Sequence, residues 1–141
     1  MPRALESLRV LIVDDEFHIR KIVKAVLQSM NIRDVTEATN GKDAYEQLRI
    51  PRALHGEKAR RFDFVICDWM MPEMTGIEFL EKVRGERFFE KLPVLMLTAE
   101  NDTNKVMKAI GQGVNDYVIK PFTAQILEEK LRKVIAKIPE D

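Results

Sequence analysis

The feature that most constrains the fold of this chain is a regular alternation between two hydrophobic periodicities. Short apolar runs, typical of strands buried on both faces of a sheet, alternate with stretches in which apolar residues recur every three or four positions, typical of amphipathic helices. The predicted strands are residues 9–14, 34–38, 64–68, 93–98 and 116–119, of which the second is the weakest. The predicted helices have apolar faces within residues 19–30, 42–48, 77–83, around 106–110 and 127–138.

This order gives β-α units from one end to the other. It predicts an α/β fold in three layers (α/β/α), with a doubly wound, five-stranded parallel sheet between two layers of helices. Thr75 and Glu78 have the spacing of a helix capping box, and Thr123 is placed to cap the last helix. With 141 residues, we expect a single domain over residues 1–141 with its core at about 8–138.

Composition excludes several classes of protein. The chain has 23 Lys and Arg against 23 Asp and Glu, and this neutrality argues against a general nucleic-acid binder or an acidic disordered chain. The single cysteine, Cys67, cannot form an internal disulfide, and no run is long and apolar enough for a membrane span. We therefore expect a cytoplasmic monomer with no nucleic-acid partner and no membrane insertion.

Polar residues follow the apolar runs where those runs end. The first run ends at Asp14, Asp15 and Glu16, and three later runs end at Asp68, Thr98 and Lys120. Parallel strands bring their carboxyl ends to one edge, where ligands of open α/β sheets bind. Each of these residues alone is as well explained as a turn residue or a cap, but the whole set is not.

The chemistry of this set fits Mg²⁺ and a phosphoryl group. Clustered carboxylates repel each other, and Mg²⁺ with its preference for oxygen ligands relieves the repulsion. A lysine and a threonine hydroxyl suit the oxygens of a transferring phosphoryl group. A carboxylate can serve as the nucleophile that forms an aspartyl-phosphate, and Asp68, which stands alone on a central strand, is the best candidate.

These residues also resemble a known family. Val-Asp-Asp at 13–15, Asp-Trp-Met-Met-Pro at 68–72, Thr-Ala-Glu at 98–100 and Asp-Tyr-Val-Ile-Lys-Pro-Phe-Thr at 116–123 are similar to the motifs of the receiver domain of two-component response regulators. The resemblance covers about residues 8–138 and is strongest to the stand-alone receivers of chemotaxis. It implies the flavodoxin-like strand order 2-1-3-4-5.

The resemblance also implies roles for individual residues. Asp68 would take a phosphoryl group from a sensor histidine kinase. Asp15, Asp68 and the backbone carbonyl of Met70 would bind Mg²⁺ directly, and Asp14 would act through a metal-bound water. Lys120 would pair with the phosphoryl group, Thr98 would move toward it, and Tyr117 would follow inward as the second switch residue.

The output implied by the resemblance is a shift of one face of the molecule, on which the expected partner contacts are Val106, Ile110, Tyr117, Ile119 and Lys130. The partner would be a downstream effector, either the flagellar switch or a histidine phosphotransfer protein of a phosphorelay. Such a protein is a signalling switch rather than an enzyme, although it catalyses its own phosphoryl transfer and autodephosphorylation. Two alternatives are weaker. A phosphatase of the haloacid-dehalogenase type needs an Asp-x-Asp pattern, which this chain lacks after its first strand. A non-phosphorylated interaction module would not need the intact set of polar residues at the strand ends.

Two departures from the family pattern stand out. Met70 occupies a position where the related chemotaxis receivers carry Asn. We expect the residue at this position to influence the lifetime of the phosphoryl group. A basic insertion at about residues 50–61 lengthens the connection between the second helix and the third strand, and residues 49–61 hold five basic residues and one acidic residue. We expect Pro51 to stop or kink the helix and the insertion to lie at the amino edge of the sheet. It is either a solvated loop or a basic docking patch.

Overall fold

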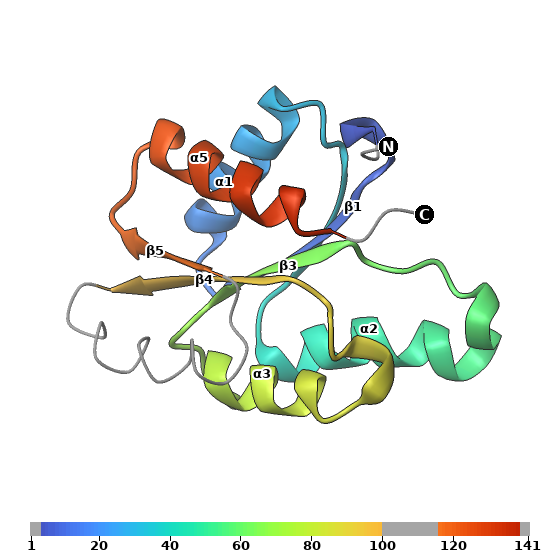
Figure 1. Ribbon diagram of the computed structural model, residues 1–141. Helices are drawn as coiled ribbons and strands as arrows, with labels where there is room; N and C mark the ends of the chain where they lie inside the picture. Colours follow the sequence, from blue (N-terminus) through green and yellow to red (C-terminus); the bar gives the residue numbers. More distant parts are fainter. Residues whose placement is uncertain (1–3, 100–115, 139–141) are drawn as a thin grey trace.

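The computed structural model describes residues 4–99 and 116–138, in which five parallel strands form one sheet of order β2-β1-β3-β4-β5 (Figure 1). This is the predicted order. The strands are β1 (Arg9–Val13), β2 (Asp34–Ala38), β3 (Phe64–Asp68), β4 (Val94–Ala99) and β5 (Asp116–Lys120). Each predicted strand agrees with the observed one to within a residue at either end. The inner strands β1, β3 and β4 are continuous apolar runs because helices cover both of their faces, whereas the edge strands β2 and β5 are only partly buried.

Helices cover both faces of the sheet. α1 (Phe17–Ser29) and α5 (Ala124–Ala136) lie on one face, and α2 (Gly41–His55) and α3 (Gly76–Arg84) lie on the other (Figure 1). Two apolar clusters fill the spaces between sheet and helices, one for each face. Three short 3-10 helices complete the described part: Leu5–Ser7, Gly56–Lys58 and Arg87–Phe89. None of the described helices is long and apolar enough to cross a membrane.

Side-chain caps fix where three of the helices begin. The Asn40 side chain accepts a hydrogen bond from the Asp43 backbone N–H (2.7 Å), and Thr123 caps α5 through the Ile126 N–H (3.1 Å). Thr75 and Glu78 form the predicted capping box at the start of α3. Such caps satisfy backbone donors that a helix cannot satisfy itself, so the starts of these helices are set locally.

Pro51 was expected to stop or kink the second helix, and the structure shows that it does not stop it. α2 includes Pro51 and continues to His55, beyond the predicted end at Leu48. Proline removes one backbone hydrogen bond, but its backbone angle is compatible with a helix. The next residue, Arg52, lies with its guanidinium carbon 3.8 Å from the centre of the Phe88 ring, a contact that favours the extra turn.

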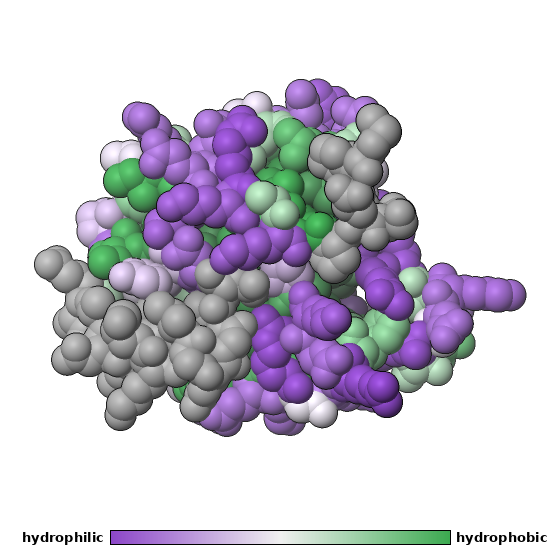
Figure 2. Space-filling model, viewed as in Figure 1, coloured by the Kyte–Doolittle hydropathy of each residue, from purple (hydrophilic) through white to green (hydrophobic). Residues whose placement is uncertain are grey.

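The surface in this view is mostly hydrophilic, and apolar residues are visible in separate patches (Figure 2). The carboxyl ends of β4 and β5 point to one side of the molecule, and the far end of α2 lies on the other (Figure 1). The insertion therefore lies at the amino edge of the sheet, as predicted. The predicted helix around residues 106–110 falls outside the described residues.

Candidate functional site

The polar residues predicted from the strand ends come together at the carboxyl edge of the sheet. Asp14 directly follows β1, Asp68 is the last residue of β3, and Lys120 is the last residue of β5. Thr98 is the penultimate residue of β4, and the register pairs it with Ile119. Because all five strands are parallel, the ends of the apolar runs meet at one place.

Three carboxylates form the centre of this site. One carboxylate oxygen each from Asp14, Asp15 and Asp68 lies within 4.8 Å of the others. Asp14 is fully buried, Asp68 is buried, and Asp15 is exposed. The Glu16 backbone N–H donates to Asp14 Oδ1 (2.9 Å), and the Arg20 guanidinium donates to the Asp14 carbonyl (2.7 Å), so the loop after β1 is held from both sides.

Lys120 supplies the cation of the site. Its Nζ donates to Asp14 Oδ2 at 3.0 Å and lies 3.3 Å from Asp68 Oδ1. Burial acts to lower the pKa of Lys120, but the hydrogen bond to Asp14 and the two negative charges outweigh it, so the pKa is raised. Lys120 is therefore held in its charged form between the two carboxylates.

Asp68 has a pKa raised from its ordinary value of 3.8 to about 6. Burial is the largest cause, and the charge of Asp14 adds to it, while Lys120 and a backbone hydrogen bond from Met70 act in the opposite direction. Burial and the same two carboxylates raise the pKa of the neighbouring Cys67 thiol well above its usual range. The site is thus rich in negative charge that the described protein groups neutralise only in part, as is common at functional sites.

This donor set fits a divalent cation. Three carboxylates at one point are hard oxygen donors of the type that Mg²⁺ prefers, and Asp15 leaves the site open to solvent on one side. Met70 is 54% exposed, and its backbone makes a hydrogen bond to Asp68.

The predicted switch residues lie on two neighbouring strands, Thr98 on β4 and Tyr117 on β5. Thr98 is fully buried, and its hydroxyl donates to the Ala99 carbonyl at 3.2 Å. Tyr117 is half-buried against the cluster on the α2–α3 face, and Lys130 Nζ lies 5.5 Å from its ring centre.

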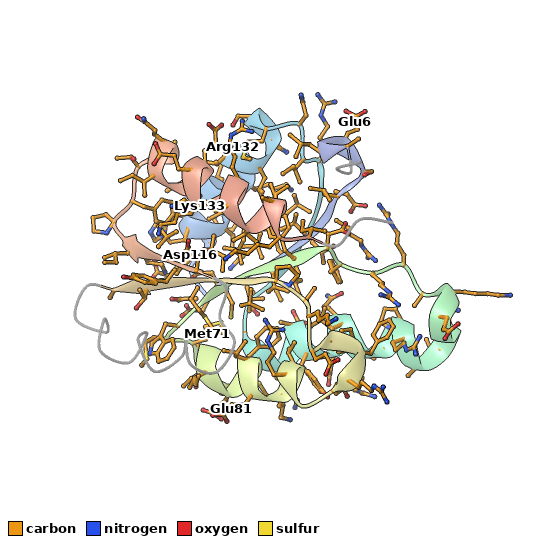
Figure 3. The ribbon with its side chains drawn as sticks, viewed as in Figure 1. Glu6, Met71, Glu81, Asp116, Arg132 and Lys133 are labelled. Atoms are coloured by element: carbon orange, nitrogen blue, oxygen red, sulfur yellow. The ribbon has the colours of Figure 1, made fainter. Side chains whose placement is uncertain are left out.

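The other predicted partner contacts are divided between described and undescribed residues. Ile119 is partly exposed on β5, and Lys130 on α5 pairs with Asp116 at 3.0 Å; Figure 3 labels Asp116 between the sheet and α5. Val106 and Ile110 lie outside the described residues.

Two contributors were missed by the sequence reasoning. A Cβ on Gly76 would lie 2.5 Å from the Asp68 carbonyl oxygen, so the first turn of α3 packs directly against the backbone of Asp68. Its position inside the Thr75–Glu78 capping box was the available signal. Arg20, which holds the Asp14 carbonyl, carries no such local signal because its role depends on the packing of α1.

Comparisons with known proteins agree with this geometry. The model of the response regulator receiver domain family matches residues 10–132. The chain is 40% identical over 131 residues to the chemotaxis protein CheY of Pseudomonas aeruginosa, covering 93% of this chain and 98% of the relative. It is 38% identical over 128 residues to the chemotaxis protein CheY1 of Helicobacter pylori strain J99, covering 91% and 97%.

Solved structures share the fold. The chemotaxis response regulator CheY4 of Vibrio cholerae superposes with a TM-score of 0.74 at 34% identity, covering 90% of this chain and 98% of that one. A putative response regulator of Chloroflexus aurantiacus gives a TM-score of 0.78 at 29% identity, covering 92% and 98%.

Proposed function

The chain belongs to the response regulator receiver domain family, and on that premise we propose that Asp68 accepts a phosphoryl group from a histidine kinase. The observation that carries this proposal is the buried Asp68 carboxylate, which lies 3.3 Å from Lys120 Nζ among three converging carboxylates. With a pKa of about 6, Asp68 is mostly ionised at neutral pH and can act as a nucleophile.

Transfer requires a small number of changes in bonding. An oxygen of Asp68 attacks the phosphorus of a phosphohistidine, a P–O bond forms, the P–N bond breaks, and the imidazole leaves with its electron pair. Lys120 is placed to move from Asp68 to an oxygen of the new phosphoryl group, because its Nζ already lies beside both carboxylates. No other described cation lies within ion-pair distance of Asp68.

Asp15, Asp68 and the Met70 carbonyl would hold Mg²⁺, and Asp14 would contribute through water. The cation supplies charge neutralisation for the transferring phosphoryl group. Asp15 keeps the site accessible from solvent, and the buried Asp14 stays fixed by its bonds to Glu16 and Lys120. We also propose that autodephosphorylation occurs at this site. Met70, which is exposed and lies two residues after Asp68, influences the rate of that reaction.

The response begins at Thr98. Its hydroxyl is bonded to the Ala99 carbonyl and must leave that bond to reach a phosphoryl oxygen. A phosphoryl group brings about −1.5 to −2 charges, which is sufficient to draw a hydroxyl into a new bond. Tyr117 then follows inward, and the surface that includes Ile119 and Lys130 changes its affinity for partners.

The test uses Trp69, which is the single tryptophan, is 5% exposed and adjoins Asp68. With Mg²⁺ and a small phosphodonor, we expect a change in Trp69 fluorescence and a mass increase of one phosphoryl group. Asp68→Asn should abolish both, and Asp34→Asn at the opposite edge should keep both. A wild-type protein that shows neither signal would contradict the proposal.

We further propose a chemotaxis-type output. Two relatives named chemotaxis proteins support it, since this chain matches 98% and 97% of their lengths. The alternative is a phosphorelay shuttle. Incubating the phosphorylated protein with a flagellar switch protein and with a histidine phosphotransfer protein separates the two outputs. Tight binding to the first protein supports chemotaxis, and loss of the phosphoryl group to the second supports the relay.

We also propose that the protein consists of a single receiver domain, is a monomer and acts in the cytoplasm.

A further inference from the structure

A second site lies at the opposite edge of the sheet. The end of α2, the segment that leads into β3 and the 3-10 helix Arg87–Phe89 enclose a cavity of about 420 Å³. This size is within the range of small-molecule pockets, roughly 300–1,000 Å³. The insertion builds one wall of the cavity, with Pro51 and Arg52 from α2 and residues 59–61 from the segment before β3.

Aromatic rings hold the arginines of this cavity in place. The Phe88 ring has the Arg52 guanidinium carbon at 3.8 Å and that of Arg61 at 4.2 Å from its centre. Arg9 lies over Phe62 in the same way, at 4.2 Å. The Arg9 guanidinium also donates to the Arg60 carbonyl at 3.0 Å, while the guanidinium groups of Arg52 and Arg61 share the Phe88 ring. A guanidinium carries several N–H donors in one plane, a geometry suited to forked recognition of phosphate or carboxylate.

The charge of the cavity is unbalanced. Its described lining contains five basic residues and one acidic residue, Asp63, whose carboxylate accepts the Arg9 backbone N–H at 2.7 Å. Arg60 is paired with Asp34, but within residues 4–99 and 116–138 neither Arg52 nor Arg61 has a carboxylate partner. The buried atoms Arg9 Nε and Arg52 Nη1 lack any hydrogen-bond partner in the same residues. Buried donors of this kind usually have a partner from the protein, from water or from a ligand.

We propose that this cavity binds a small organic anion in which a phosphate is joined to a planar ring, of the size of a nucleoside monophosphate. The arginines recognise the phosphate. The apolar walls, formed among others by Leu48, Phe62 and Phe89, accept the ring. The site is independent of phosphoryl transfer at Asp68, since the two lie at opposite edges of the sheet.

The test titrates the full chain with adenosine monophosphate in EDTA, which keeps the nucleotide from binding through a metal at the acidic edge. Calorimetry or NMR shifts of residues 47–63 report binding. We expect saturable binding, weakened about tenfold or more in the Arg52→Gln/Arg61→Gln variant. Arg132→Gln/Lys133→Gln on α5 removes the same charge elsewhere and should bind as the wild type does.

Ligand fragments and a conservative variant separate specific recognition from simple attraction. Adenosine and ribose 5-phosphate should each bind more weakly than the whole nucleotide. The Arg52→Lys variant keeps the positive charge but should lose affinity for the nucleotide, and a urea titration should show that it is folded. Equal binding of inorganic phosphate and nucleotide, or unchanged affinity in Arg52→Lys, would overturn the proposal. So would an acidic peptide that binds at residues 47–63 while the nucleotide does not.

Discussion

The two edges of the sheet carry opposite charges and stabilise them by different means. At the carboxyl edge, Asp14 and Asp68 are buried beside each other with Lys120 between them. At the amino edge, Arg9, Arg52 and Arg61 are spread on aromatic rings. The first arrangement concentrates charge at a point and raises the pKa of an acid, whereas the second places each guanidinium over an aromatic ring, with Arg52 and Arg61 sharing Phe88. The net charge of zero is thus a balance between two unlike regions.

This difference predicts that charge removal has larger effects at the carboxyl edge. Burial of a charged group without a partner costs more than the loss of an exposed charge. The following changes test the comparison in order of expected size.

Lys120→Met should have the largest effect. It leaves Asp14 and Asp68 buried beside each other without their cation, and we expect the free energy of unfolding at pH 7 to fall by about 3 kcal/mol. Urea unfolding measures it, with the exposed Lys133→Met as the matched control, which should change by less than about 0.5 kcal/mol. Equal stability of the two variants would show that the carboxylates do not depend on Lys120.

Asp68→Asn should stabilise the protein in a pH-dependent way. Because folding raises the pKa of Asp68 from 3.8 to about 6, the ionised carboxylate reduces stability above pH 6, and this cost disappears as the pH falls through that interval. After allowance for solvent screening we expect a gain of about 2 kcal/mol at pH 7.5 and almost none at pH 3.5. Unfolding is measured without divalent cations. A gain that is the same at both pH values would mean that ionisation of Asp68 is not its source.

Arg61→Gln should have the smallest effect. Its guanidinium is exposed and stacks on Phe88, so the variant should lose about 0.5–1 kcal/mol of stability, with little dependence on pH between 4 and 8. The same urea titrations measure it, and the loss should fall well below that of Lys120→Met. A loss as large as that of Lys120→Met would remove the distinction between the edges.

Sequence alone determined much of this protein. The alternation of periodicities predicted the strands to within a residue, most clearly for the inner strands β1, β3 and β4, because a strand covered on both faces must be continuously apolar. The residues that end these runs predicted the acidic site, since parallel strands deliver their ends to one edge. Helix capping by Thr75 and Thr123 was also predictable from the sequence, because a cap contacts a backbone group three residues away.

Tertiary structure decided the rest. Burial of Asp68 against Asp14 raises its pKa, and this depends on β1 and β3 being neighbours. In the part of α2 that continues past Pro51, Arg52 contacts Phe88, which lies far along the chain. The amino-edge cavity likewise forms from segments separated in sequence, so a stretch that resembles a solvated basic loop becomes the wall of a pocket. Contacts of this kind have no local period or cap, because their physical cause is the packing of one segment on another.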